Sequence, residues 1–173
     1  GTGTLTLSGA NTYSGGTTIN AGVVSVGNDS NLGDTSGALT FGGGTLQASS
    51  SFSTSRSVTL NAGGGTFNTN GNSLTLAGNI IGTGTFTKTG LGTLTLSGAN
   101  TYSGGTTVSA GILQGDSTSL QGNILNNSQV VFNQGTDGTY AGAMTGSGLL
   151  TKQGAGTLTL SGANTYSGGT TVS

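Results

Sequence analysis

The sequence predicts an all-β protein built as a single-stranded parallel β-helix, a solenoid of about eight coils. Its apolar residues occur in short clusters that alternate with Thr or Ser, and Gly, Asn and Ser separate the clusters. No window shows the i, i+3, i+4 apolar spacing of an amphipathic helix. A string of residues also recurs three times, at 3–19, 92–108 and 156–172. Short strands joined by many tight turns, with a recurring unit, are typical of a solenoid.

The recurring string reads GTLTLSGANTYSGGTTI in its first copy, and only its last residue changes, from Ile19 to Val108 and Val172. The copies start 89 and 64 residues apart, which are the differences between positions 92 and 3 and between 156 and 92. These gaps correspond to about four coils of ~22 residues and about three coils of ~21 residues. At ~4.8 Å per coil, the predicted rod would be roughly 40 Å long.

The first copy shows why each element is expected. Residues 4–7 alternate Thr with Leu, which predicts a half-buried strand with leucine inside. Residues 17–19 and 23–26 are the next two expected strands. Gly tolerates positive φ and Asn can close a turn through its side chain, so the segment between the strands is expected to turn. We expect one Asn and one Tyr of each copy at the corners of the coils, namely Asn11, Asn100, Asn164, Tyr13, Tyr102 and Tyr166.

The rest of the chain has the same character. Residues 27–37 (GNDSNLGDTSG) form the most polar loop and contain two of the four Asp. Further strands are expected at 38–41, 45–47, 57–60, 66–68, 73–76, 79–81, 85–88, 112–113, 123–125, 129–132, 139–140 and 149–152, besides those inside the second and third copies.

Two other architectures agree less well with this pattern. A disordered chain often carries a strong net charge and scatters its apolar residues, whereas this chain has a formal net charge of −1 and clusters them. A β-sandwich would use longer strands joined by hairpins. The Asn-Gly hairpin signal occurs at Asn70-Gly71 but is not repeated systematically.

Composition excludes several classes of function. The chain has 37 Gly, no Cys, His or Trp, and 4% charged residues, against about 25% in ordinary soluble domains. Without His or Cys, the usual catalytic triads and zinc sites cannot form. The small net charge gives no attraction to nucleic acid or anionic membrane. No apolar run approaches the ~20 residues of a membrane helix, and residues 1–10 lack the pattern of a signal peptide.

Residues 82–108 (GTGTFTKTGLGTLTLSGANTYSGGTTV) and residues 146–172 resemble the autotransporter-associated β-strand repeat. This unit is also called the passenger-associated transport repeat, and it occurs in passenger domains of the type V secretion route. Lys88 and Lys152 stand at the lysine position of the family unit. The first copy lacks the leading half of the unit, and the third stops before the A-G-x-L that follows the second copy at 110–113.

The resemblance implies a right-handed β-helical stalk that a Gram-negative bacterium secretes or displays at its surface. It also implies that the repeats aid folding and export of the passenger. Because the chain begins in one copy and stops inside another, we expect residues 1–173 to be a single β-helix segment, a fragment of a longer passenger. Host or neighbouring-cell surfaces would then be contacted through other parts of the protein.

The leading hypothesis is therefore a structural stalk or scaffold of an adhesin, with no enzymatic activity and no catalytic, cofactor or metal site. An alternative is a rod that associates with itself through its uncharged Thr, Ser and Asn faces or by end-to-end stacking. A less favoured alternative is a carbohydrate-active β-helix, which needs paired carboxylates about 5–10 Å apart. Asp29 and Asp34 are the only acids close in sequence, and we expect them in a solvated loop. We expect Arg56 to be a surface charge.

Three further patterns could in principle serve binding. Thr-x-Thr pairs occur at 4/6, 85/87, 93/95 and 157/159, but most coils lack them, so β propensity on a solvent face is the expected cause. The tyrosines of the three copies could stack on sugars. We expect instead that each packs over the corner of its own repeat with the hydroxyl reaching solvent. The 27–37 loop has two carboxylates but lacks a calcium-binding motif.

Overall fold

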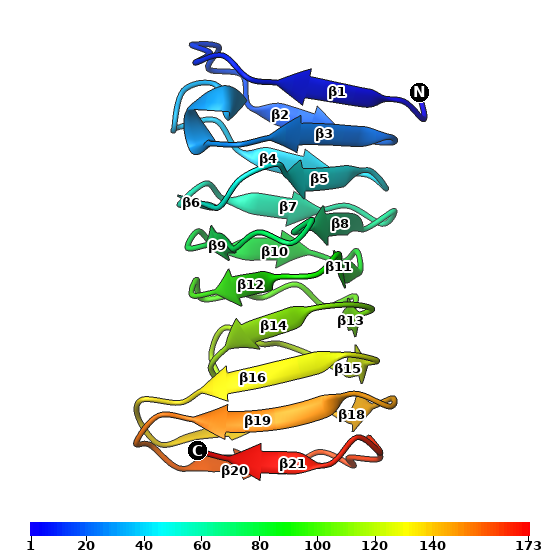
Figure 1. The fold of residues 1–173 in the computed structure, drawn as a ribbon, viewed down its shortest axis with the longest axis vertical. Coiled ribbons are helices and arrows are strands. Elements are labelled where there is room, and N and C mark those ends of the chain that lie inside the picture. The colour runs from blue at the N-terminus through cyan, green and yellow to red at the C-terminus, as the bar shows by residue number, and fades with distance from the viewer.

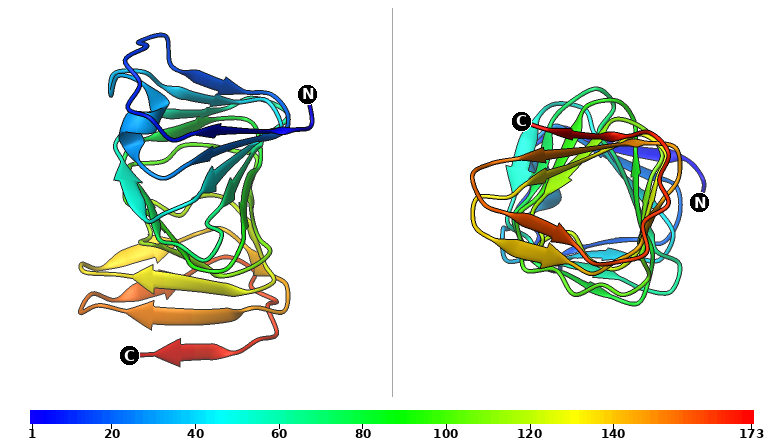
Figure 2. Two further views of the ribbon diagram at one scale, coloured as in Figure 1. Left: turned by 45° about the horizontal axis from the view of Figure 1, so that its top comes forward. Right: turned by 90° about the horizontal axis from the view of Figure 1, so that it is seen from below.

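Parallel strands stacked along one axis make up the chain, and the computed structural model describes all of residues 1–173 (Figure 1). All pairs between neighbouring strands are parallel, as predicted. In Figure 1 the chain crosses the near face from right to left, returns behind and descends toward the C-terminus, which is a right-handed winding. The end-on view in Figure 2 shows the coils enclosing one continuous interior.

Four sheets run along the rod. Sheet A contains β1 (Thr4–Leu7), β3 (Val23–Val26), β5 (Thr45–Ala48), β8 (Gly65–Asn68), β11 (Phe86–Thr89), β13 (Thr106–Val108), β15 (Ile124–Asn126) and β18 (Met144–Thr145). Sheet B contains β2 (Thr17–Ile19), β4 (Leu39–Phe41), β7 (Val58–Leu60) and β10 (Ile80–Gly82). Sheet C contains β6 (Phe52–Thr54), β9 (Leu74–Leu76), β12 (Thr93–Leu96), β14 (Ile112–Gly115), β16 (Gln129–Asn133), β19 (Leu149–Gln153) and β21 (Thr170–Val172). Sheet D contains β17 (Gly138–Tyr140) and β20 (Leu158–Leu160).

Each coil visits three faces in the order A, C, B. Sheet D continues the face that sheet B begins, because residues 100–103 stack on β10 and the segment around Ser119 stacks on Asn100 in turn. Partners in successive coils of sheet A lie 18 to 22 residues apart, as in Thr106↔Ile124 and Val23↔Thr45. The chain completes about eight coils, in agreement with the sequence prediction.

The structure contains three elements that the sequence pattern did not predict. Strand β6 lies in a serine-rich stretch whose composition favours a loop, and pairing with β9 organises it as a strand. Strand β18 has only two residues, too few to show alternation. The 3₁₀ helix η1 (Asp29–Leu32) replaces the sheet C strand of its coil, and Asn28 caps it by accepting from the Ser30 N–H.

The interior is an unbroken apolar column of 27 buried residues. Four aromatic rings follow one another through its middle, with centroid distances of 4.9 Å for Phe41–Phe67, 4.7 Å for Phe67–Phe86 and 5.5 Å for Phe86–Tyr102. Aromatic pairs at these separations stabilise the fold beyond what the burial of their apolar area contributes. The aromatic stack therefore ties sheets A and B together over several coils.

The two consecutive glycines of the recurring string are required for different reasons. A Cβ on Gly104 would overlap the backbone of Gly84 in the preceding coil. The next residue, Gly105, has φ of 78°, a conformation that side chains disfavour. The pair thus combines close coil contact with a left-handed turn into β13.

We predict that Gly104→Ala lowers the free energy of unfolding by about 1–3 kcal/mol, the usual range for overpacking. Gly15→Ala is the matched control at the same position of the first copy, since nothing lies within 4 Å of a Cβ placed there. Urea unfolding followed by circular dichroism should lower the midpoint for Gly104→Ala alone. Equal midpoints for the two variants would contradict the close contact between coils.

Candidate functional site: the repeat junctions

The three copies of the recurring string lie on different faces of the rod. Copy one runs from β1 in sheet A to β2 in sheet B. Copy two runs from β12 in sheet C to β13 in sheet A, and copy three from β20 in sheet D to β21 in sheet C. In each copy the SGANTYSGG segment crosses the intervening face without forming a strand. We call this segment, with the side chains it positions, the repeat junction.

This rotation corrects the predicted repeat spacing, which assumed whole coils. Four coils carry the chain along sheet A from Thr4 to Thr87, and the next six residues bring it to Thr93 on sheet C. Three coils then lead along sheet C from Thr93 to Leu149, and copy three follows on the next face. Each copy therefore begins about one third of a turn beyond the copy before it.

The asparagine of the junction hydrogen-bonds to neighbouring coils. Asn100 is 4% exposed, and its Oδ1 accepts from the backbone N–H of Ile80 at 2.8 Å. Its Nδ2 donates to the backbone carbonyl of Ser119 at 2.7 Å. Ile80 belongs to the preceding coil and Ser119 to the following one, so one amide joins three coils.

Each of the other two asparagines makes one of these two hydrogen bonds, because each lies in a terminal coil with a neighbouring coil on one side. Asn164, in the last coil, accepts from the N–H of Met144 in the preceding coil at 2.9 Å. Asn11, in the first coil, donates to the carbonyl of Asn31 in the following coil at 2.8 Å. All three side chains lie on the crossing segments between strands and bond to backbone groups.

The tyrosine of each junction hydrogen-bonds to the threonine four residues later. The Oη–Oγ1 distances are 2.9 Å for Tyr13–Thr17, 2.7 Å for Tyr102–Thr106 and 2.6 Å for Tyr166–Thr170. The expectation that the hydroxyl reaches solvent is wrong for Tyr102, which is 2% exposed and stacks on Phe86. Burial also raises the pKa of the Tyr102 hydroxyl.

The lysine of the family unit is inside the rod. Lys88 is fully buried, and its Nζ donates to Thr69 Oγ1 at 2.9 Å and to the carbonyls of Thr89 at 2.9 Å, Gly90 at 2.6 Å and Ala110 at 3.0 Å. These oxygens come from three successive coils. Burial lowers the pKa of Lys88 to about 8. Lys152, in the penultimate pass of sheet C, is half-buried and donates to the carbonyl of Gly154.

Arg56 is the largest departure from the sequence prediction. The expected surface charge is 2% exposed, and its Nε lies 2.8 Å from Oδ1 of Asp29. Its guanidinium also donates to the carbonyls of Gly33 at 2.7 Å, Gly37 at 2.9 Å and Asp34. The polar loop is therefore wrapped around one buried cation of the next coil, and Asp29 is not the freely solvated acid that was expected.

Asp34 remains exposed, and its carboxylate accepts from the N–H and hydroxyl of Ser36, which lowers its pKa. No cluster of three or more potential metal-ligating acids, His or Cys occurs in the structure. None of its helices has the length and apolar character needed to cross a membrane. Spacing gave no signal for the use of Arg56, because its partners lie 19 to 27 residues earlier.

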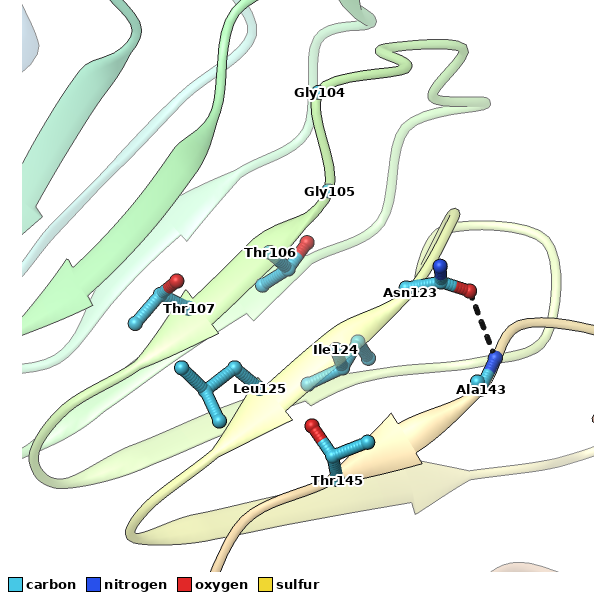
Figure 3. A pocket seen from close by; sticks show the side chains of 9 residues that line it. All are labelled: Gly104, Gly105, Thr106, Thr107, Asn123, Ile124, Leu125, Ala143 and Thr145. Carbon is cyan, nitrogen blue, oxygen red and sulfur yellow. Dashed lines mark hydrogen bonds between the residues drawn. The ribbon is translucent and has the colours of Figure 1, made fainter. Parts of the chain in front are cut away.

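The outward side chains of sheet A carry no charge. Figure 3 shows one hollow on it, of about 320 Å³, where Thr107, Leu125 and Thr145 stand side by side on β13, β15 and β18. At its edge Asn123 Oδ1 accepts from the N–H of Ala143 at 2.9 Å. The hollow is shallow and lined by a few small residues, so it offers a flat contact rather than an enclosing pocket. The outward column along sheet A is Thr4, Val23, Thr45, Thr66, Thr87, Thr107, Leu125 and Thr145.

The repeats and the solenoid together define the class of protein. Residues 1–26, 86–114 and 150–173 match the family model of the passenger-associated transport repeat. These three stretches are copies of that repeat, and they are set in a parallel β-solenoid. The sequence resemblance is thereby confirmed.

A particular relative supports the same assignment. The chain is 45% identical over 154 residues to the adhesin BmaC autotransporter of Brucella suis biovar 1 (strain 1330). The alignment covers 87% of this chain and 4% of that protein, so the chain spans a small part of its relative. No solved structure matches the chain. The repeat and the relative indicate a protein that is secreted or displayed at the cell surface.

We predict that Asn100→Ala lowers the free energy of unfolding by about 2–4 kcal/mol, because it leaves a buried N–H and a buried carbonyl without partners, each costing about 1–3 kcal/mol at most. Asn20→Ala is the control, since Asn20 is exposed and its side chain makes no hydrogen bond in the structure. Chemical denaturation of both variants measures the difference. A loss for Asn100→Ala no larger than for Asn20→Ala would refute the bridging role.

We also predict that stability rises between about pH 8 and pH 10. The folded-state pKa of Lys88 is about 8, below its ordinary value of 10.5, so in this window the unfolded chain binds more protons than the folded one. The full effect is about 3 kcal/mol at 1.36 kcal/mol per pKa unit. Burial raises the pKa values of Tyr102 and Tyr140, so stability falls again above pH 10 as the unfolded tyrosines ionise.

Urea midpoints measured from pH 7 to pH 11 would test this profile. Lys88→Met should abolish the rise and keep the fall, while Lys152→Met should keep both. A rise that persists in Lys88→Met would show that another group causes it.

Proposed function

We propose that this chain is a scaffold segment of an autotransporter adhesin passenger, and that its repeats aid the folding and export of that passenger. The observation that carries the proposal is the junction at Asn100, where one side chain satisfies backbone groups of the preceding and the following coil. A coil that contains a junction therefore helps to organise both of its neighbours. Hydrogen bonds of this kind between successive coils favour folding one coil at a time, as a passenger must do while it emerges from the cell.

The distribution of side chains agrees with a scaffold. The charged side chains of Arg56 and Lys88 are buried. Their N–H groups donate hydrogen bonds to backbone and side-chain oxygens of neighbouring coils. In this proposal residues 1–173 are a single segment of a longer passenger. Contact with host or neighbouring cells is made by other parts of the protein.

The proposal is tested in the complete surface protein. Simultaneous Asn11→Ala, Asn100→Ala and Asn164→Ala substitutions should reduce protease-resistant passenger at the cell surface several-fold, as measured by flow cytometry with an antibody to the folded rod. A control with Asn20→Ala and Asn61→Ala should display normal amounts. Normal display of the junction variant would remove the proposed role in folding and export.

A second candidate function is self-association through the face of sheet A. The observation that favours it is the outward column of that sheet, which holds Thr in most rows and no charged residue. Two such faces could approach without bringing like charges together. When residues 1–173 are studied as an isolated chain, the outer edges of β1 and β21 offer a separate, end-to-end contact.

Sedimentation velocity over a hundredfold range of concentration distinguishes these contacts. Thr66→Lys with Thr87→Lys should abolish lateral association and leave end-to-end association unchanged. Thr40→Lys with Thr59→Lys, on the outside of sheet B, is the matched control. A strict monomer at every concentration would eliminate this candidate. Tight binding of the isolated chain to a defined receptor would instead count against a pure scaffold.

A further inference from the structure

Lys88 is the one charged residue in a mostly apolar inward stripe of sheet A. The stripe consists of the inward residues that pair in register from coil to coil, and most of them are buried aliphatic or aromatic side chains. In order they are Leu5, Val24, Leu46, Phe67, Lys88, Val108 and Asn126. An aliphatic residue at this place would pack well without needing any polar partner. The lysine therefore requires an explanation beyond filling the core.

The surroundings of its ammonium group satisfy the charge without a counter-ion. Four oxygens lie within 3.0 Å of Nζ, and none of them belongs to a carboxylate. The chain's ion pair is formed elsewhere, between Arg56 and Asp29. Thr69 Oγ1 comes from the coil before Lys88 and the Ala110 carbonyl from the coil after it. Thr69 is itself fixed, because its hydroxyl donates to the carbonyl of Leu91 at 2.6 Å. The oxygen cage exists only when three coils are stacked in one particular alignment.

The rest of the sheet does little to fix that alignment. Its strands are two to four residues long, and most of them carry Thr at an outward position. A slip of one strand by two residues keeps the inward side chains inside and the outward side chains outside, because side chains alternate with a period of two. The same slip moves each backbone group by about 6.7 Å along the strand. The Ala110 carbonyl would then be out of reach of Nζ, and a buried cation would lose a partner.

We propose that Lys88 sets the register of the solenoid: its caged ammonium makes slipped stacking of β11 on β13 unfavourable, while contributing little to overall stability. A buried polar group can select one arrangement among similar ones even where an apolar residue would be equally stable. This role goes beyond the proposed scaffold function and does not depend on what the scaffold carries. It assigns a purpose to the lysine of the repeat that simple core packing does not.

Disulfide trapping reads the register directly, because the chain has no native cysteine. Thr87 and Thr107 are outward partners in the observed register. Cysteines at these two positions would have Cα atoms about 4.8 Å apart, which permits a disulfide. The pairs Thr87→Cys with Ser109→Cys and Thr89→Cys with Thr107→Cys report slips by two residues in the two directions. In the observed register the Cα atoms of these pairs are about 8 Å apart, too far for a bond.

Each cysteine pair is placed in the complete 1–173 chain, in three backgrounds: the natural sequence, Lys88→Met and Leu46→Met. Leu46→Met is the matched control, an isosteric change in the same stripe. After oxidation in a glutathione buffer, the slipped disulfides should form at least fivefold more in Lys88→Met than in the other two backgrounds. The urea midpoint of Lys88→Met at pH 7 should equal or exceed that of the natural sequence.

Two results would overturn the proposal. Slipped disulfides that stay as rare in Lys88→Met as in Leu46→Met would show that packing alone sets the register. A Lys88→Met chain that fails to fold, or whose midpoint falls, would show that the oxygen cage supplies stability rather than alignment.

Discussion

Parallel stacking of one coil on the next is the constraint on which the rest of this structure depends. A residue in an inner strand has neighbours about 4.8 Å above and below it, so its charge and size must be compatible with the coils on both sides. Uncharged Thr and Ser tolerate such neighbours, and like charges do not. The sparse charge of the chain, the glycines that would clash with the previous coil and the long apolar interior all follow from this one geometry.

Side chains that would be exposed in most folds become structural parts under this constraint. The stacked backbone leaves some N–H and C=O groups unpaired wherever a segment crosses a face without forming a strand. Asn100, Lys88 and Arg56 supply the missing partners, and no buried side-chain nitrogen or oxygen is left unsatisfied. These polar and charged side chains therefore point inward and bind the protein's own backbone. This is the main reason that its outer faces are chemically plain.

The sequence predicted the architecture well because alternation is a local signal. The strands at residues 4–7, 17–19 and 23–26 have the bounds that the Thr and Leu pattern indicates. The burial of Arg56 was not predictable from local pattern, because its partners lie about one coil away. Alternation places Lys88 on the same face as Phe86, but nothing local shows the oxygens of neighbouring coils that bind its ammonium group. The rotation of the repeat copies did leave a signal in the sequence. Neither 89 nor 64 is a multiple of a coil of about 20 residues, and the whole-coil interpretation concealed that remainder.

That rotation has a mechanical consequence for a long, thin rod. A hydrogen-bonded junction that always occurred on one side would leave the opposite side more compliant, and the rod would bend preferentially in one plane. Here successive junctions lie on sheets C, B and A in turn as the chain passes from copy one to copy three. A lateral force from any direction therefore acts within a few coils on a face that a hydrogen-bonded junction stabilises, so the rod has no single weak side.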